Sequence, residues 1–162
     1  MKTATYFKLG SVAFAVAVGA TLFNLNAKVN APQAAVLAQT TPPVEQITID
    51  GLLEGTNRLR PTPLTLDPEL NVSASAKCAD MAAKNYWAHD APDGTEPWVF
   101  FPAHRKAGEN LAYKYKTSSE VLSGWRISPT HYANIIRTEF SRVGFAICDF
   151  RNTKLVVQHF RD

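Results

Sequence analysis

Four histidines and one glutamate are the residues whose types best suit chemistry in this chain. The histidines are His89, His104, His131 and His159, and the acid is Glu109. Two imidazole nitrogens and one carboxylate oxygen form a ligand set that suits zinc and leaves one coordination position for water. The sequence has no HExxH motif, however, and a scattered set of histidines and acids is by itself a weak signal. These residue types indicate a metal or ligand site only if the fold brings them together.

Three of these residues lie at the ends of predicted elements, where functional side chains usually project. His89 follows a long predicted helix as the chain enters a loop of sequence HDAPDGTEP, and Glu109 opens a predicted strand. His131 lies one turn into another predicted helix. Structural roles suit the other two better, and we expect His104 in a solvated loop and His159 as a hydrogen-bonded histidine on the last strand. The candidate site therefore consists of His89, Glu109 and His131.

The helices are predicted from apolar spacing and from capping residues. They cover residues 44–59, 68–85, 120–127 and 129–136, with a short helix at 98–104. Asp67-Pro68 starts the second of them, because an N-cap residue is followed by proline at the first helical position. Ser128-Pro129 starts the fourth by the same logic. The buried face of the second helix is expected to be an alanine-rich stripe of Leu70, Ala74, Cys78, Met81 and Ala82.

Strands are predicted mainly in the second half of the chain. Residues 109–116 alternate in character, which is typical of a strand with one polar face. Residues 142–150 and 154–160 are rich in strand-forming residues, and residues 151–153 join them as a hairpin. A short extended piece at residues 64–66 can add a fourth strand. Helices combined with a small antiparallel sheet predict an α+β fold, arranged as an αβα sandwich.

The formal charge of +3 lies entirely in the first 31 residues. Lys2, Lys8 and Lys28 occur there without any acid, which leaves 14 basic and 14 acidic residues in the rest of the chain. A positive start followed by the apolar run at residues 9–23 is typical of an export signal. The run is short for a spanning helix, which needs about 20 apolar residues. We predict cleavage after Ala38, with an uncleaved N-terminal anchor as the alternative.

The chain is therefore expected to contain one folded domain behind a leader. Residues 1–38 form a signal peptide or anchor with a leader remnant, residues 39–43 a linker, and residues 44–162 the domain. A hydrophobic fraction of 46% argues against intrinsic disorder. A net charge of zero outside the leader argues against a nucleic-acid partner, and contact with a membrane is expected only through an uncleaved leader. We expect a secreted, extracellular or cell-envelope protein, and its oligomeric state stays open.

The two cysteines, Cys78 and Cys148, have two open interpretations. Export favours an oxidising compartment, in which the pair can form a disulfide between the long helix and the hairpin. The alternative is two buried free thiols. Cys78 lies on the apolar helix stripe, so an exposed and activated thiolate is not expected there, and a cysteine hydrolase is excluded.

Five segments of the sequence together resemble the CAP superfamily, also called the SCP domain. This superfamily contains cysteine-rich secretory proteins, antigen 5 and pathogenesis-related proteins, and the bacterial branch is the most similar. The resemblance covers roughly residues 44–162. In chain order, the segments are MAAKNYWAHDAPDG (81–94), GENLAY (108–113), GWRISPTHYANII (124–136), FSRVGFA (140–146) and LVVQHF (155–160).

The resemblance implies an αβα sandwich that encloses a cleft lined by two histidines and two glutamates. The family's motifs place the histidines at His89 and His131 and one glutamate at Glu109. Ser128 occupies the position where the family often has its second glutamate, so the four-residue metal site is incomplete. A zinc ion bound by the remaining three residues would be completed by water or by Asn134.

Three functions follow from this resemblance. The first is an exported domain that binds a lipid, a wall polymer or a protein in the cleft. The second is a zinc-assisted hydrolase that uses the same residues, in which the ion activates bound water. The third is a structural or adhesive surface module. The family has no single shared reaction, so the fold does not decide whether the protein is an enzyme.

Overall fold

The computed structural model describes residues 45–162. The predicted leader and linker, residues 1–43, lie outside this range. Within residues 45–162, no helix has the length and apolar character needed to cross a membrane. The elements are α1 (Ile49–Arg58), β1 (Thr65–Leu66), α2 (Pro68–Ala83), the 3-10 helix η1 (Pro97–Phe100), β2 (Ala107–Tyr113), α3 (Ser118–Ile127), α4 (Pro129–Ile136), β3 (Arg142–Phe150) and β4 (Thr153–Arg161).

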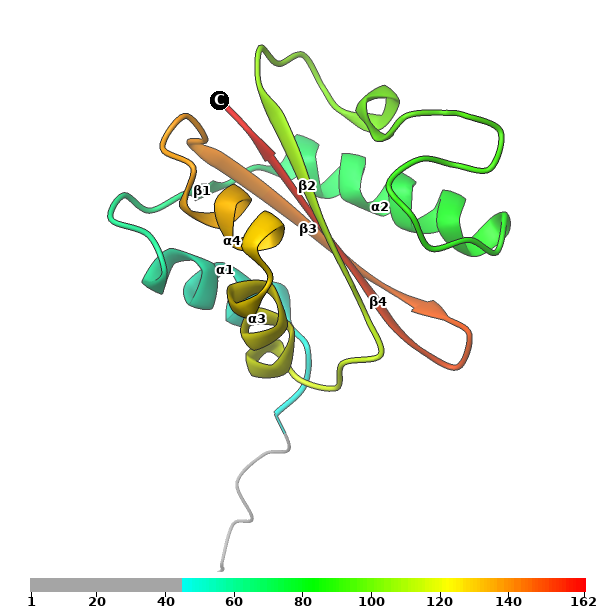
Figure 1. Ribbon diagram of the computed structural model, residues 1–162, viewed down its shortest axis with the longest axis horizontal. Helices are drawn as coiled ribbons and strands as arrows, with labels where there is room; N and C mark the ends of the chain where they lie inside the picture. Colours follow the sequence, from blue (N-terminus) through cyan, green and yellow to red (C-terminus); the bar gives the residue numbers. More distant parts are fainter. Residues whose placement is uncertain (1–44) are drawn as a thin grey trace, which may run out of the picture. The chain divides into compact units, whose positions relative to one another are not determined.

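One mixed sheet forms the centre of the described domain, with strand order β1-β3-β4-β2 (Figure 1). The three long strands pair antiparallel, as predicted, while the two-residue β1 adds a parallel pair with β3. Arg151 and Asn152 connect β3 to β4 with positive φ angles of 47° and 63°, as a two-residue hairpin turn requires. The strand order places β4, the last strand in the chain, inside the sheet and β2 at its edge.

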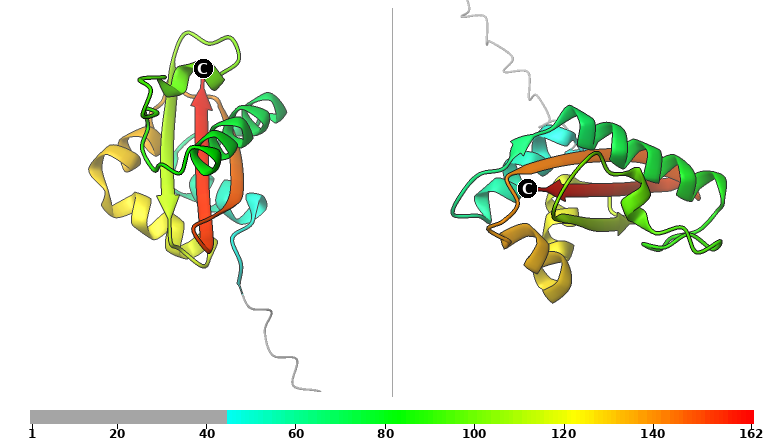
Figure 2. Two further views of the ribbon diagram at one scale, coloured as in Figure 1. Left: turned by 90° about the vertical axis from the view of Figure 1, so that its right-hand side faces the viewer. Right: turned by 90° about the horizontal axis from the view of Figure 1, so that it is seen from above.

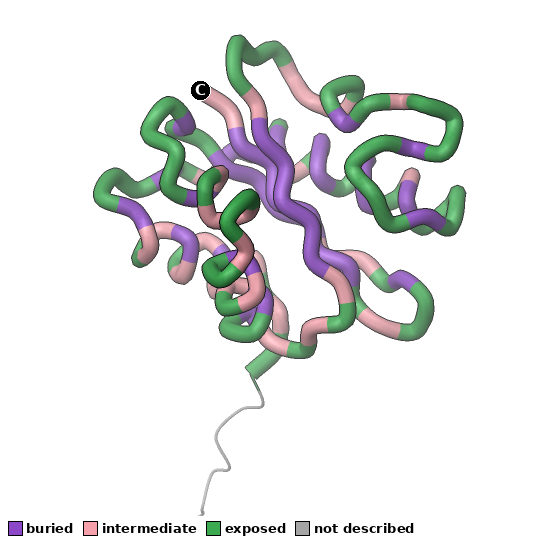
Figure 3. The backbone as a smooth tube through the Cα atoms, viewed as in Figure 1, coloured by how far each residue is buried: buried purple, intermediate pink, exposed green. Residues whose placement is uncertain are grey.

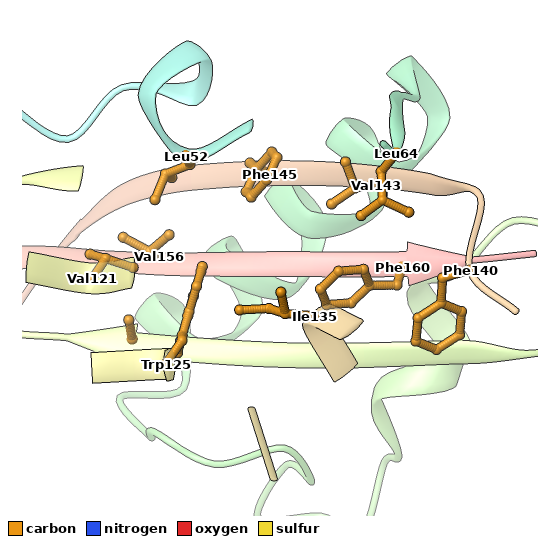
Figure 4. Packing of buried hydrophobic residues seen from close by; sticks show 11 residues of the cluster. Leu52, Leu64, Val121, Trp125, Ile135, Phe140, Val143, Phe145, Val156 and Phe160 are labelled. Carbon is orange, nitrogen blue, oxygen red and sulfur yellow. The ribbon is translucent and has the colours of Figure 1, made fainter. Parts of the chain in front are cut away.

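Helices cover both faces of this sheet, which confirms the predicted αβα sandwich. Helix α2 lies on one face, and α1, α3 and α4 lie on the other (Figure 2). Each face has its own hydrophobic cluster. Figure 4 shows the cluster beneath the three helices, where Trp125 and Val121 of α3 pack with Phe145, Val156 and Phe160 of the sheet.

Helix α2 packs unusually close to the sheet at Gly144. A Cβ atom at this position would lie 2.3 Å from the backbone carbon of Leu70, so only glycine fits there. The expected buried stripe of α2 is otherwise correct except at its end, where Ala82 is exposed. Each step of four residues rotates a side chain by about 40° around the helix, so a stripe continued by fours turns away from the sheet. Lys77 is fully buried instead, which the sequence analysis did not predict.

Strand β2 differs from its prediction as a strand with one polar face. Gly108 to Ala112 are all buried, and Asn110 on the expected polar face is fully enclosed (Figure 3). The reason is that helices pack on both faces of the sheet and also reach its edge, where the Trp125 indole nitrogen donates a hydrogen bond to the Leu111 carbonyl at 3.1 Å.

Helix α1 also starts later than predicted, because Thr48 accepts a side-chain hydrogen bond from the Gly51 amide.

A disulfide joins Cys78 of α2 to Cys148 of β3, with 6.3 Å between the two Cα atoms. It links the helix layer to the sheet and closes a loop across a sequence separation of 70 residues. Its stabilising effect comes from restricting the unfolded chain.

We predict that replacing both cysteines by alanine lowers the free energy of unfolding by about 4 kcal/mol, the value that the chain-entropy model gives for a loop of this length. Denaturant unfolding of the variant and of the oxidised wild-type protein measures the difference. Mass analysis of fresh protein after thiol labelling under denaturing conditions provides the control. Two labelled thiols in the wild-type protein would contradict the disulfide.

Candidate functional site

Glu109 occupies the centre of the candidate site because of the strand register. It lies on β2 directly opposite His159 of β4, on the sheet face that α2 covers. Its side chain is only 1% exposed. A carboxylate at such a position must be paired or strongly hydrogen-bonded, because burial of a bare charge is costly.

Two imidazole rings satisfy the two carboxylate oxygens. His89 Nδ1 lies 2.6 Å from Glu109 Oε1, and His159 Nε2 lies 2.9 Å from Glu109 Oε2. An ionised carboxylate only accepts hydrogen bonds, so both of these nitrogens carry protons. The other nitrogen of His159 then accepts a hydrogen bond from the Ser73 hydroxyl of α2, at 2.8 Å. Ser73, His159, Glu109 and His89 thus form one chain of hydrogen bonds from the core to the surface.

The pKa values of this chain follow from burial and hydrogen bonding. Burial alone would raise the pKa of Glu109, but the hydrogen bonds from His159 and His89 outweigh it and hold the pKa below its ordinary value. Burial lowers the pKa of His159, which is fully enclosed and therefore neutral. The hydrogen bond to Glu109 raises the pKa of His89, whose side chain is 53% exposed.

Lys77 supports the loop that carries His89. Its Nζ donates to the Tyr86 hydroxyl at 3.0 Å and to the His89 carbonyl. The Tyr86 hydroxyl in turn donates to Asp80 at 2.6 Å. Burial lowers the pKa of Lys77, while the nearby charge of Glu109 opposes this shift. The ammonium group is therefore a buried anchor that holds the backbone of His89 against α2.

Asn134 and Asn110 connect helix α4 to the same strand. Asn134 Nδ2 donates to the Glu109 carbonyl at 3.1 Å and to Asn110 Oδ1 at 3.0 Å. Asn110 Nδ2 donates to the His131 carbonyl at 3.1 Å and to Gln158 at 3.0 Å. These bonds fix the helix that carries His131 relative to the strand that carries Glu109.

Two hollows flank His89, and we call them together the His89 cleft. The larger, of about 490 Å³, borders Glu109 and Asn134. The smaller, of about 330 Å³, borders His131 and Leu111. A still larger hollow, of about 650 Å³, lies between α3 and the loop before it, and no histidine borders it. Of the predicted residues, Glu109 and Asn134 therefore border one hollow, His131 borders the other, and His89 borders both.

The structure places His131 at the cleft and Ser128 away from it. The half-buried His131 lines the smaller hollow beside His89, and burial together with the charge of His89 lowers its pKa. Ser128 borders neither hollow and its hydroxyl lies 3.3 Å from that of Thr130. Ser128 is the N-cap residue of α4, as predicted, but its side chain makes no capping hydrogen bond. Pro129 and the Ser128 carbonyl, which accepts from the Tyr132 amide at 2.9 Å, start this helix instead.

The predicted zinc ligands do not form a three-residue metal site as they stand. Both oxygens of Glu109 accept hydrogen bonds from imidazole N–H groups, and the carboxylate thereby positions His89. Among residues 45–162, no three His, Cys, Asp or Glu side chains are arranged to hold one metal ion. Zinc binding by His89, His131 and Glu109 therefore stays a prediction, and we derive no chemical step from it.

His159 is the buried, hydrogen-bonded histidine that the sequence predicts, although its partner Glu109 was not foreseen. Two further residues of the site were missed in the sequence. Ser73 and Lys77 were not singled out, although a lysine within an apolar helix stripe was a usable signal. The prediction for His104 is consistent with the structure, in which this exposed ring lies 2.8 Å from the Pro102 carbonyl.

Comparison with known proteins identifies similar sequences and folds. Residues 56–160 match the model of the cysteine-rich secretory protein family, CAP. The uncharacterized protein YkwD of Bacillus subtilis is 38% identical over 86 residues, which make up 51% of this chain and 34% of YkwD. The chain thus spans about a third of the length of this relative.

Two solved structures share the fold. An extracellular protein containing an SCP domain from Bacillus anthracis matches with a TM-score of 0.60 and 25% identity, over 69% of this chain and 39% of that one. An outer surface protein from Borrelia burgdorferi matches with a TM-score of 0.60 and 20% identity, over 70% of this chain and 87% of that one.

We predict that Glu109→Gln lowers the pKa of His89 to below its ordinary value. The substitution removes the charged acceptor that favours the protonated ring, and partial burial and the nearby Lys77 charge then dominate. NMR titration of the imidazole C–H signals measures the change. Glu54→Gln, which removes an exposed carboxylate on α1, is the matched control and leaves the pKa of His89 unchanged. An unaltered value in Glu109→Gln would contradict the assignment.

We also predict that zinc binds to the metal-free protein with a Kd no tighter than about 1 μM. The reason is that Glu109 is occupied by its two histidine partners. Isothermal titration of the wild-type protein and of the His89→Ala and His131→Ala variants measures this. A Kd well below this value that is lost in both variants would show that the carboxylate or its partners rearrange to bind the ion.

Proposed function

Because residues 56–160 match its family model, the chain belongs to the cysteine-rich secretory protein (CAP) family, and from this premise we propose that it is an exported domain that binds a ligand in the His89 cleft. Export is supported by the positive, apolar start of the chain. It is also supported by two similar structures, one named as an extracellular protein and the other as an outer surface protein.

The observation that supports the ligand site is the fixed orientation of the His89 ring. Its Nδ1–H is held by the buried Glu109 carboxylate, so Nε2 is the nitrogen left for an outside group. Among the described residues, no hydrogen-bond partner of Nε2 is found. A polar group that is fixed in advance and borders an open hollow loses little entropy when a ligand binds to it.

The same geometry favours binding over the two alternatives predicted from the sequence. A hydrolase would need Glu109 as a free base or metal ligand, whereas this carboxylate is buried and accepts two hydrogen bonds. A purely structural module would not need His89 and His131 at a hollow with partly open side chains. Ligand binding uses all of these features together.

In this proposal, His89 acts as a switchable hydrogen-bonding group. Its neutral ring offers Nε2 as an acceptor, and its protonated ring offers an N–H and a positive charge. Glu109 favours the protonated form. His131, whose pKa is lowered, is mainly neutral and offers a second imidazole at the same hollow.

We predict that the protein sediments with purified cell-wall material, with lipid vesicles, or with both, and that His89→Ala and His131→Ala each weaken this retention at least tenfold. Co-sedimentation with each material, quantified on gels, measures it. His104→Ala is the matched control, since His104 is exposed and borders neither hollow of the cleft. Equal retention of all four proteins, or no retention on either material, would contradict the proposed function.

A further inference from the structure

Two tryptophans border the two hollows of the His89 cleft, one in each hollow. Trp87 borders the smaller hollow with His131, and Trp98 borders the larger hollow with Glu109. Their side chains are 50% and 43% exposed, which leaves large apolar surfaces in contact with water. A single exposed aromatic residue needs no explanation. Two of them in the two hollows that share His89 do.

Each of these tryptophans rests on another aromatic ring. Trp87 packs against Tyr113 of β2, with 5.8 Å between ring centroids, and Trp98 packs against Phe101 at 5.6 Å. Phe101 is itself stacked on His159 at 4.0 Å. These tilted ring contacts restrict the motion of each indole, so its exposed surface is a held platform instead of a loose side chain.

Polar groups lie between and beside the two platforms. The larger hollow is bordered by the acids Asp90 and Glu96 and by Arg137, and the smaller one by the hydroxyl of Thr130. His89 belongs to both. Rigid aromatic faces combined with carboxylates, a guanidinium and an imidazole match one ligand chemistry well. A sugar ring has an apolar C–H face that stacks on an indole and a rim of hydroxyls that needs donors and acceptors.

The other ligand classes fit these observations less well. A lipid chain requires a deep apolar pocket, whereas charged side chains border the larger hollow. A nucleic acid requires a positive surface, and three acids (Asp90, Glu96 and Glu109) beside one arginine do not provide it. The mixed charge instead suits a ligand that is rich in hydroxyl groups.

From this arrangement we propose that the His89 cleft binds an oligosaccharide, with one sugar ring on Trp87, another on Trp98, and hydroxyl groups of the chain at His89. The inference rests on the proposed function and names its ligand class. Trp87 and Trp98 set the specificity for a sugar chain, and His89 fixes its register between them.

The test uses three soluble probes, namely the tetrasaccharides chitotetraose, cellotetraose and maltotetraose. NMR spectra of the indole N–H groups, recorded during titration, report binding directly at the tryptophans. We expect at least one probe to bind with a Kd of about 1 mM or tighter and to shift the indole signals of Trp87 and Trp98. Trp87→Ala and Trp98→Ala each weaken that binding at least tenfold, while Trp98→Phe retains most of it.

Val99→Ala is the matched control, because Val99 is exposed next to Trp98 but does not border the cleft. Circular dichroism of every variant verifies the fold. Failure of all three probes to bind, or binding that survives both alanine substitutions, overturns this inference. Retention on lipid vesicles that depends on His89, with no oligosaccharide binding, also overturns it and leaves the proposed function standing.

Discussion

The buried Glu109 carboxylate is the constraint on which the rest of the site depends. A charge that is this far removed from water is tolerated only with strong partners, and the chain provides one imidazole for each oxygen. One of these, His159, is enclosed and neutral, while the other, His89, reaches the surface. The buried carboxylate needs hydrogen-bond donors, and because His89 is one of them, the carboxylate fixes the orientation of the His89 ring at the surface. Among residues 45–162, no other side-chain hydrogen bond of His89 is found.

Four elements of the fold, namely β2, β4, α2 and α4, position the groups around Glu109. Strand pairing between β2 and β4 sets Glu109 opposite His159, and α2 covers the pair with the Ser73 hydroxyl and the Lys77 ammonium group. Helix α4 is tied to the opposite side of β2 through Asn134, which accounts for the position of His131 at the same cleft. The disulfide and the close contact at Gly144 hold α2 on the sheet. The helix layers, the strand register and the side-chain hydrogen bonds together thus assemble the site around β2, the edge strand of the sheet.

Local signals allowed much of the fold to be predicted, whereas the contacts of the site depend on tertiary packing. Asp67 caps α2 and Pro129 begins α4, as expected, because capping depends on residues that are adjacent in the sequence. The partnership of Glu109 with His159 depends on strand register, which no local pattern specifies. The position of Lys77 beside an apolar helix stripe was a local signal of its burial, but its contact with the His89 carbonyl forms only after the loop folds back onto α2. The family resemblance brought His89, Glu109 and His131 together, but it did not distinguish a metal ligand from a positioning carboxylate.

The protonation pattern of the two histidines that contact Glu109 is the most direct test of this account. Long-range ¹H–¹⁵N NMR spectra distinguish the two neutral tautomers of an imidazole. At a pH where both rings are neutral, the account predicts that His89 carries its proton on Nδ1 and that His159 carries it on Nε2, with both shifts altered by Glu109→Gln. His89 with its proton on Nε2, or spectra that do not respond to the substitution, would contradict the claim that Glu109 orients the ring toward the cleft.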